Sequence, residues 1–167
     1  MEQTLFTADN NYLFNTGEIS NYDGDSFKLT ISKPYRFDFG FEIEDRGIKT
    51  FRIEMRLHGV DTPELRARRP DWTAAGYLAR DKAREWLEKF RPILFLSIKY
   101  EKGNYGRALG DFVSTQVEDA RLSDYLIGGR MAVAYHGQSK AEVEPVHAEN
   151  IAYLKSKGLL VPYLVKQ

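Results

Sequence analysis

A change of hydrophobic period near the middle of the chain limits the folds that this sequence can adopt. Apolar and polar residues alternate strictly over 35–43 and again over 51–57, whereas apolar residues recur every three or four positions over 73–90. Alternation places one face of a strand in a core, and the longer period gives a helix one apolar face. The sequence therefore predicts strands followed by an amphipathic helix of about Thr73–Phe90, ending before Pro92, in an α+β fold.

The rest of the chain adds shorter elements of both kinds, with a turn predicted at Asp45–Gly47. Further strands are predicted over Thr16–Ser20, Ser26–Ser32, Ile93–Tyr100 and Arg107–Ser114. Further helices are predicted over Leu122–Ile127 and about Glu144–Lys157. About five strands with a helix after the third are compatible with a five-stranded β-barrel of the OB type that carries about three helices. Periodicity alone also allows other α+β arrangements.

Length and composition exclude several classes of protein. The chain has 167 residues, which predicts a single domain over 1–167, and it has no Cys, which excludes disulfides and thiolate chemistry. Its longest apolar runs fall far short of the roughly 20 residues that cross a bilayer. The first residues do not resemble a signal peptide, so we expect a cytoplasmic protein without membrane contact. The net charge is zero, yet residues 52–107 carry 13 basic and 8 acidic side chains.

Three short segments carry the candidate chemistry: Asp23–Ser26, Arg56–Glu64 and Tyr105–Arg107. Taken singly, the first is typical of a turn, the second of a helix entry and the third of a hairpin with a solvated arginine. Taken together, they supply two carboxylates, those of Asp25 and Asp61. Carboxylate oxygens are the hard ligands that Ca²⁺ and Mg²⁺ prefer.

The remaining polar groups of these segments suit the hydrolysis of a phosphodiester. The backbone carbonyl of Thr62 is a further candidate metal ligand, and Glu64 is a candidate base for the attacking water. Negative charge that builds on the phosphoryl oxygens is stabilised by fixed guanidinium groups, and Arg56 and Arg107 come from different predicted strands. The sequence therefore predicts a metal-dependent nuclease site.

The order of these motifs resembles that of the staphylococcal nuclease (thermonuclease-like) family. The motifs are Asp-Gly-Asp-Ser, then Arg-Leu-x-Gly-Val-Asp-Thr-Pro-Glu, then Tyr-Gly-Arg, and the similarity extends from about Gly17 to Gly137 and more loosely to Leu159. The resemblance implies an OB-fold barrel with helices packed against it. It also implies Ca²⁺-dependent hydrolysis of DNA and RNA that leaves a 3′-phosphate.

The resemblance also implies a role for each matching residue. Asp25 and Asp61 correspond to the carboxylate ligands, Thr62 to the carbonyl ligand, Glu64 to the general base, Arg56 and Arg107 to the phosphate-binding arginines, Asp23 to an acidic residue beside the metal, and Tyr105 and Tyr135 to nucleotide-contacting tyrosines. Two positions depart from the family pattern, because Asn104 stands where a lysine is expected and Gly137 where a second tyrosine is expected. Both changes concern nucleotide binding rather than catalysis.

Several features outside the motifs have their own interpretations. The aromatic hairpin over 33–50 is longer than in the family, and we expect it to pack on the barrel, with a substrate or subunit contact as the alternative. Arg66–Arg69 is predicted to be a solvated loop, with steering of phosphates toward the site as the second interpretation. The apolar tail Leu159–Val165 is predicted to dock on the domain. Three histidines are predicted to be surface or packing residues: His58, His136 and His147.

Two functions from different classes fit these observations. The first is a Ca²⁺-dependent nuclease, with Mg²⁺ as the possible substitute, acting as a monomer on DNA or RNA, with single-stranded substrates expected. The second is a non-catalytic module on the same fold that binds nucleic acid or protein. The complete set of carboxylates and arginines favours the enzyme, whereas the zero net charge favours the module, because phosphate-rich partners attract cationic surfaces.

Overall fold

Five strands form the sheet of this α+β protein. The computed structural model describes residues 12–40, 44–98 and 107–164. The strands are β1 (Tyr12–Asn21), β2 (Ser26–Asp38), β3 (Glu44–Leu57), β5 (Ile93–Ile98) and β6 (Ala108–Ser114). β1 pairs with β2 on one side and with β5 on the other, so the order β1-β2-β3-β6-β5 closes on itself. All these pairs are antiparallel except β3 with β6, which is parallel.

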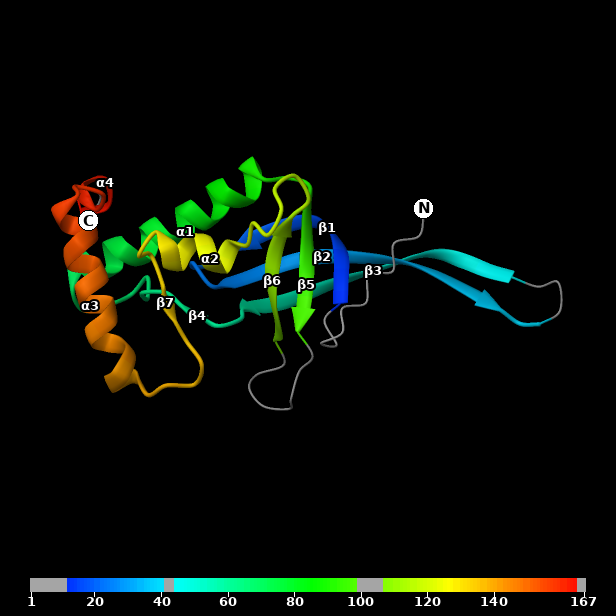
Figure 1. Cartoon of the computed structure of the whole chain (residues 1–167), viewed down its shortest axis with the longest axis horizontal. Helices are drawn as coiled ribbons and strands as arrows, with labels where there is room; N and C mark the ends of the chain where they lie inside the picture. The colour runs from blue at the N-terminus through cyan, green and yellow to red at the C-terminus, as the bar shows by residue number, and fades with distance from the viewer. Residues whose placement is uncertain (1–11, 41–43, 99–106, 165–167) are drawn as a thin grey trace.

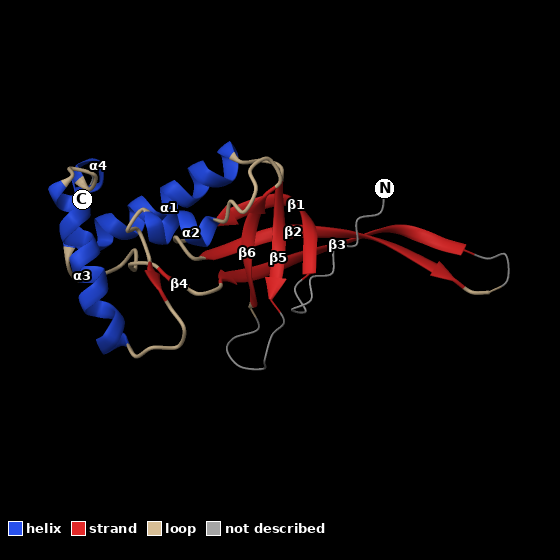
Figure 2. Cartoon of the chain, in the orientation of Figure 1, coloured by secondary structure: helices blue, strands red, loops and turns tan. Residues whose placement is uncertain are grey.

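In the described residues, four helices and a two-stranded ribbon accompany the sheet. The helices are α1 (Pro70–Lys89), α2 (Leu122–Gly128), α3 (Lys140–Ser156) and α4 (Val161–Leu164), and the ribbon pairs β4 (Val60–Asp61) with β7 (Val133–Ala134). In Figure 1, α3 and α4 lie at the end of the molecule farthest from the projecting part of β2 and β3. Figure 2 shows that this projection consists of strand alone, with no helix against it.

The core fills the space between the strands and α1. Alternate residues of β2 and β3 point into it, among them Phe27, Leu29 and Met55, and the ring of Phe27 meets that of Phe112 edge to face at 5.0 Å. Helix α1 contributes a stripe of small and large apolar side chains: Ala74, Ala75, Leu78, Ala79, Ala83, Trp86 and Leu87. The strands before the predicted change in hydrophobic period and the helix after it are therefore the elements that pack together to form this core.

The predicted helices are confirmed, but their ends differ. Helix α1 begins three residues before the predicted Thr73, with Pro70 in its first turn, where the missing N–H costs no hydrogen bond. Helix α3 begins at Lys140 rather than Glu144. Its start is fixed by a capping box, because the backbone N–H of Ser139 donates to Glu142 Oε2 at 2.8 Å. Helix α4 is additional to the three helices that the sequence predicts.

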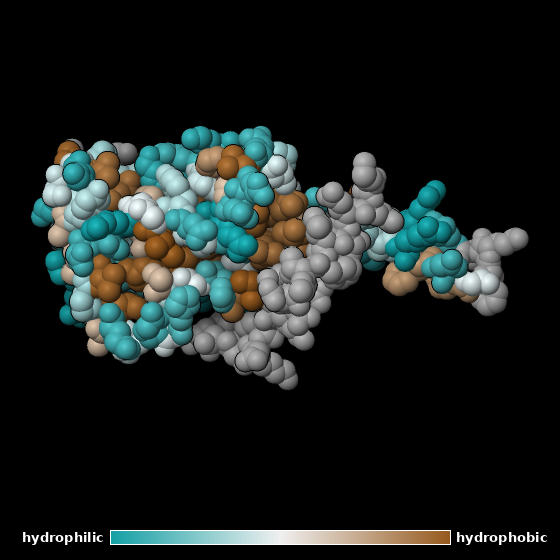
Figure 3. All heavy atoms as spheres, viewed as in Figure 1, coloured by the Kyte–Doolittle hydropathy of each residue, from teal (hydrophilic) through white to brown (hydrophobic). Residues whose placement is uncertain are grey.

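The hairpin over 33–50 differs most from its prediction. The predicted turn at Asp45–Gly47 is wrong, because these residues lie in β3 and pair with 35–37 of β2. Packing on the barrel is also wrong, because β2 and β3 run beyond it, with Phe37 57% exposed and Ile48 72% exposed. In Figure 3, one side of this projection is hydrophilic and the other hydrophobic. The last two apolar residues of the predicted alternating strand, Phe41 and Ile43, lie outside the described residues.

The end of the described chain packs against the body. Leu160 is fully buried in the core, and Tyr163 and Leu164 pack against it, so docking of the apolar tail is confirmed up to residue 164. Within the described residues, no helix combines the length and the apolar character that a membrane crossing requires.

Candidate functional site

The first predicted motif forms the turn between β1 and β2. Asp23 Oδ1 accepts hydrogen bonds from the backbone N–H groups of Ser26 at 2.7 Å and of Asp25 at 3.2 Å. Such a side-chain-to-backbone pair fixes the turn. Asp23 therefore holds the backbone in the conformation that directs the Asp25 side chain into the protein, where it is buried.

Arg56 links the first motif to the second. Its Nη2 lies 3.2 Å from Asp25 Oδ2 and 2.9 Å from Asp61 Oδ1. Arg56 lies on β3 and Asp61 on β4, immediately after the tight turn at Gly59. Three of the predicted site residues, which come from three different strands or turns, therefore converge on one point, with two carboxylates facing a single guanidinium group.

Two glycines make this convergence possible. A methyl group on Gly24 would lie 2.7 Å from Thr62 Cγ2, so the first motif can approach the buried Thr62 this closely only without a side chain. A methyl group on Gly76 would lie 2.6 Å from the carbonyl oxygen of Pro63 and 3.0 Å from that of Glu64. Helix α1 therefore packs directly on the backbone that carries the candidate base.

The electrostatics of the convergence are dominated by Asp25. Burial raises the pKa of Asp25 from 3.8 to about 7, the nearby charge of Asp23 also raises it, and Arg56 opposes both. A carboxyl group this far from water ionises readily only when positive charge is close by. Asp25 is therefore a group whose charge state responds strongly to whatever cation lies beside it.

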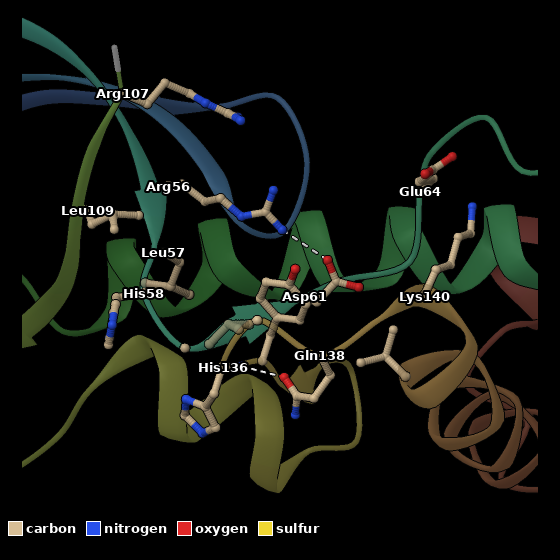
Figure 4. Close-up of a pocket in the computed structure, with 15 residues that line it drawn as sticks. Arg56, Leu57, His58, Asp61, Glu64, Arg107, Leu109, His136, Gln138 and Lys140 are labelled. Carbon is tan, nitrogen blue, oxygen red and sulfur yellow. Dashed lines mark hydrogen bonds and ion pairs between the residues drawn. The ribbon is translucent and has the colours of Figure 1, made fainter. Parts of the chain in front are cut away.

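One cavity of about 650 Å³ opens over this cluster. It is lined by Arg56, Asp61, Glu64, Arg107 and Tyr135, among other residues. Figure 4 shows the side chains of Arg107, just before β6, and of Arg56, on β3, extending in the same direction, with Glu64 at the other end of the view. The ring centroid of Tyr135 lies 5.9 Å from Arg56 Cζ. Candidates from the second and third motifs thus share one cavity, and the first motif reaches its edge through the ion pair of Asp25 with Arg56.

Not every predicted residue joins the contacts of the cluster. Glu64 and Arg107 line the cavity, but within the described residues neither makes an ion pair with the other members. Thr62 is buried beside Asp61. Tyr105 lies outside the described residues. Among the residues that are described, no group of three His, Cys, Asp or Glu side chains is arranged to hold a metal, so a cation here would rely on the two carboxylates and on other oxygens.

The main residue that sequence analysis missed is His147. The prediction of a surface or packing role is incomplete, because His147 is buried and its Nε2 forms a hydrogen bond with Asp61 Oδ2 at 2.9 Å. Both carboxylate oxygens of Asp61 are therefore held, one by Arg56 and one by His147. The spacing of Val143, His147 and Ile151 on α3 indicates that His147 faces the core, but nothing in the sequence identifies its partner.

Comparison with known proteins adds no identification. No protein-family model matches the chain, and no curated protein matches it either. The residues and their geometry therefore carry the functional argument.

Proposed function

We propose that the chain is a Ca²⁺-dependent nuclease of the staphylococcal nuclease type, built on an OB-fold barrel, that hydrolyses phosphodiester bonds of single-stranded DNA or RNA. The observation that carries the proposal is the convergence of Asp25 and Asp61 on Arg56, beside one cavity that Arg56 and Asp61 line together with Glu64 and Arg107. A phosphodiesterase needs carboxylates for a cation, a base for water and guanidinium groups for the phosphate, and each of these is present.

The two arginines would bind the phosphate of the scissile bond. Arg56 lies on β3 and Arg107 immediately precedes β6, the strand that pairs with β3 in parallel and places Leu109 in register with Arg56. Both side chains line the cavity and extend in the same direction in Figure 4, which suits binding of one phosphate through two sets of N–H donors. Removal of one such donor from a charged transition state typically costs about 10²–10³-fold in rate.

Glu64 would align the attacking water and take its proton as the water oxygen bonds to phosphorus. The bond from phosphorus to the 5′ oxygen then breaks, the 5′ oxygen gains a proton from solvent, and the phosphate stays on the 3′ oxygen. Glu64 is exposed at the cavity, so water reaches it freely. A base of this kind contributes about 10²–10⁴-fold to the rate.

The donor set fits a hard cation in part. Asp25 and Asp61 present oxygens to a common point, and the Thr62 carbonyl would add a third ligand. Ca²⁺ takes six to eight oxygens, so water and the substrate would supply the others. The bound cation would polarise a phosphoryl oxygen and stabilise the ionised form of Asp25, which burial disfavours.

The test is an incubation of the purified protein with end-labelled single-stranded DNA and RNA in Ca²⁺, in Mg²⁺ and in chelator. We expect cleavage with Ca²⁺, none in chelator, and products that a 3′-phosphatase shifts on a gel. Arg107→Ala should lose activity and keep the thermal unfolding temperature. The matched control is Arg52→Ala, which removes an exposed arginine from β3 outside the cavity. Equal activity of Arg107→Ala and Arg52→Ala would contradict the proposal.

One observation favours the second candidate, a non-catalytic module that binds nucleic acid. Arg56 already makes direct ion pairs with both Asp25 and Asp61, so each of these carboxylates has a partner within the chain. For a module of this kind we expect binding of labelled oligonucleotides in chelator, without cleavage under any of the three conditions. The same incubation therefore separates the two candidates.

A further inference from the structure

A second cavity of about 550 Å³ adjoins the candidate site. The two cavities share four lining residues: Asp61, Glu64, Lys140 and Val143. The second cavity therefore adjoins, at Glu64, the first cavity, which Arg56 and Arg107 line. A polymer held at the first cavity would have this second cavity directly beside the bond that is cut.

The wall of the second cavity is rich in cations. Arg66, Arg68, Arg69 and Lys140 all line it. Arg69 pairs with Asp71 at 3.5 Å, whereas Arg66 and Arg68 are exposed and make no ion pair with any described residue. Two unpaired guanidinium groups beside a cavity suit phosphate groups, which they bind with parallel N–H donors.

The acidic groups of the same wall do not cancel this charge. Asp61 pairs with Arg56 and is hydrogen-bonded to His147, so both of its carboxylate oxygens already have partners. Glu64 lies at the boundary between the two cavities, and Glu144 is the one further acid among the described lining residues. Four cations therefore line this wall with three acids, and Arg66 and Arg68 are among the cations that pair with none of the described acids.

Trp72 gives the cavity an aromatic wall. Its ring centroid lies 5.8 Å from that of His147 and 5.3 Å from Arg69 Cζ. Its indole N–H is buried and has no acceptor among the described residues, which is costly unless a ligand or water supplies one. Aromatic rings next to guanidinium groups form the type of surface on which single-stranded nucleic acids stack their bases.

We propose that the second cavity is a subsite for the nucleotides that flank the scissile bond, with Arg66 and Arg68 binding their phosphates and Trp72 contacting a base. This subsite rests on the proposed function, because it takes the continuation of the strand that the first cavity holds. It makes the enzyme sensitive to substrate length, since a dinucleotide ends before it reaches Arg66 and Arg68. The loop 66–69 thereby gains a binding role.

The test compares substrates of two lengths. The variant is the double substitution Arg66→Ala and Arg68→Ala, and the control is Lys155→Ala with Lys157→Ala, which removes two cations of α3 and its C-cap that line neither cavity. On an oligothymidylate of about ten nucleotides, which spans a typical single-stranded site, we expect kcat/KM of the variant to fall about tenfold. On a dinucleotide we expect the variant to match the wild type.

Salt dependence provides a second readout. Each phosphate contact with single-stranded nucleic acid contributes about 0.7 to the slope of log affinity against log salt. The double variant should therefore show a slope shallower by about 1.4 for the long substrate, from two lost contacts. The lysine control should keep the wild-type slope.

The outcomes separate the subsite from the nuclease activity. If the wild type cleaves and the double variant matches the control on both lengths, the subsite is wrong and the nuclease stands. An equal loss on both lengths also overturns it, because the arginines would then act on the scissile bond itself. If the wild type cleaves nothing, fluorescence anisotropy of the labelled oligothymidylate in chelator decides: weaker binding by the double variant supports the subsite, and equal binding overturns it.

Discussion

The candidate site and the β2–β3 hairpin are both rich in charged and aromatic side chains, but they are held together in opposite ways. In the site, Asp61 is bound by Arg56 and by His147, which lies 86 residues away and is buried. In the hairpin, Arg36 pairs with Glu44 at 2.9 Å across adjacent strands, at the surface. The site therefore depends on the whole fold, whereas the hairpin depends on its own two strands.

This difference predicts which substitutions will change activity or stability. Exposed ion pairs such as that of Arg36 and Glu44 contribute about 0–1 kcal/mol, because water screens them and ordering the side chains costs entropy. A buried carboxylate that loses its cationic partner is left as an unpaired charge, and the resulting loss of stability is several times larger. We expect substitutions in the site to change activity or stability strongly, and those in the projecting hairpin to change neither.

The largest effect is expected at Glu64. Glu64→Gln keeps the size of the side chain and removes its ability to accept a proton, so kcat should fall about 10²–10⁴-fold. The change in kcat is measured by steady-state cleavage of an oligonucleotide in Ca²⁺. The control is Glu85→Gln on α1, which removes a charge that pairs with Lys82 away from the cavity. Full activity of Glu64→Gln would show that another group activates the water.

The raised pKa of Asp25 predicts that the free energy of unfolding depends on pH. Its pKa rises from 3.8 to about 7 on folding, so between these values the folded protein binds more protons than the unfolded one. The free energy of unfolding of the metal-free protein should therefore fall as the pH rises from about 4 to above 7. Urea unfolding in chelator at several pH values tests this.

Asp25→Asn is the control for that titration. The amide does not ionise, so the contribution of this position to the pH dependence should vanish. The difference in free energy of unfolding between the two proteins should therefore change from about pH 4 and level off above about pH 7. Parallel curves for the wild type and Asp25→Asn would contradict the assignment. If Ca²⁺ binds here, adding it should restore stability to the wild type above pH 7.

His147 is expected to act as a positioning residue for Asp61. His147→Leu removes the hydrogen bond to Asp61 Oδ2, and His147→Gln restores a donor of similar reach. Loss of a partner that orients a metal ligand typically weakens metal affinity about 10–100-fold. Half-maximal Ca²⁺ concentrations for cleavage should therefore rise with Leu and recover with Gln. A purely structural histidine would give equal Ca²⁺ requirements in both variants.

A smaller effect is expected at Gly76, where α1 meets the backbone of Glu64. Gly76→Ala brings a methyl group within 2.6 Å of the Pro63 carbonyl oxygen, and overpacking of this kind costs about 1–3 kcal/mol. Gly128→Ala at the end of α2 is the matched control, because its methyl group would meet nothing within 4 Å. Chemical denaturation measures both. Equal stability of the two variants would show that α1 can move away from the site without cost.

The sequence predicts the fold well where a pattern and a packing partner coincide. The alternation over 51–57 identifies β3, and Met55 and Leu57 are buried as expected. The same pattern fails at Phe51, which is 53% exposed because β3 extends beyond the barrel there. Alternation reports which residues share a face of a strand, but the point at which the covering layer ends depends on the lengths of other strands.

The sequence predicts the candidate site only in part, because local patterns identify the elements but not how they pack together. The motifs bring together Asp25, Arg56 and Asp61, because each lies in or next to a turn or strand that local signals identify. The contact between His147 and Asp61 and the second cavity beside Arg66 both arise when α3 packs near α1 and β4. No local pattern encodes which helix will lie against which turn, so these features become visible only in the folded chain.

The smallest effect is expected from aromatic residues of the projecting hairpin. Phe37 lies beyond the barrel and is 57% exposed, with its main ring contact to Tyr35 of the same strand at 5.6 Å. Phe37→Ala should change the free energy of unfolding by no more than about 0.5 kcal/mol, since surface substitutions remove little buried area. Phe112→Ala removes a fully buried ring and should cost about 3–5 kcal/mol. If Phe37→Ala approached the cost of Phe112→Ala in denaturant unfolding of the dilute protein, the hairpin would be covered in solution, and the contrast between a fold-dependent site and a self-contained hairpin would fail.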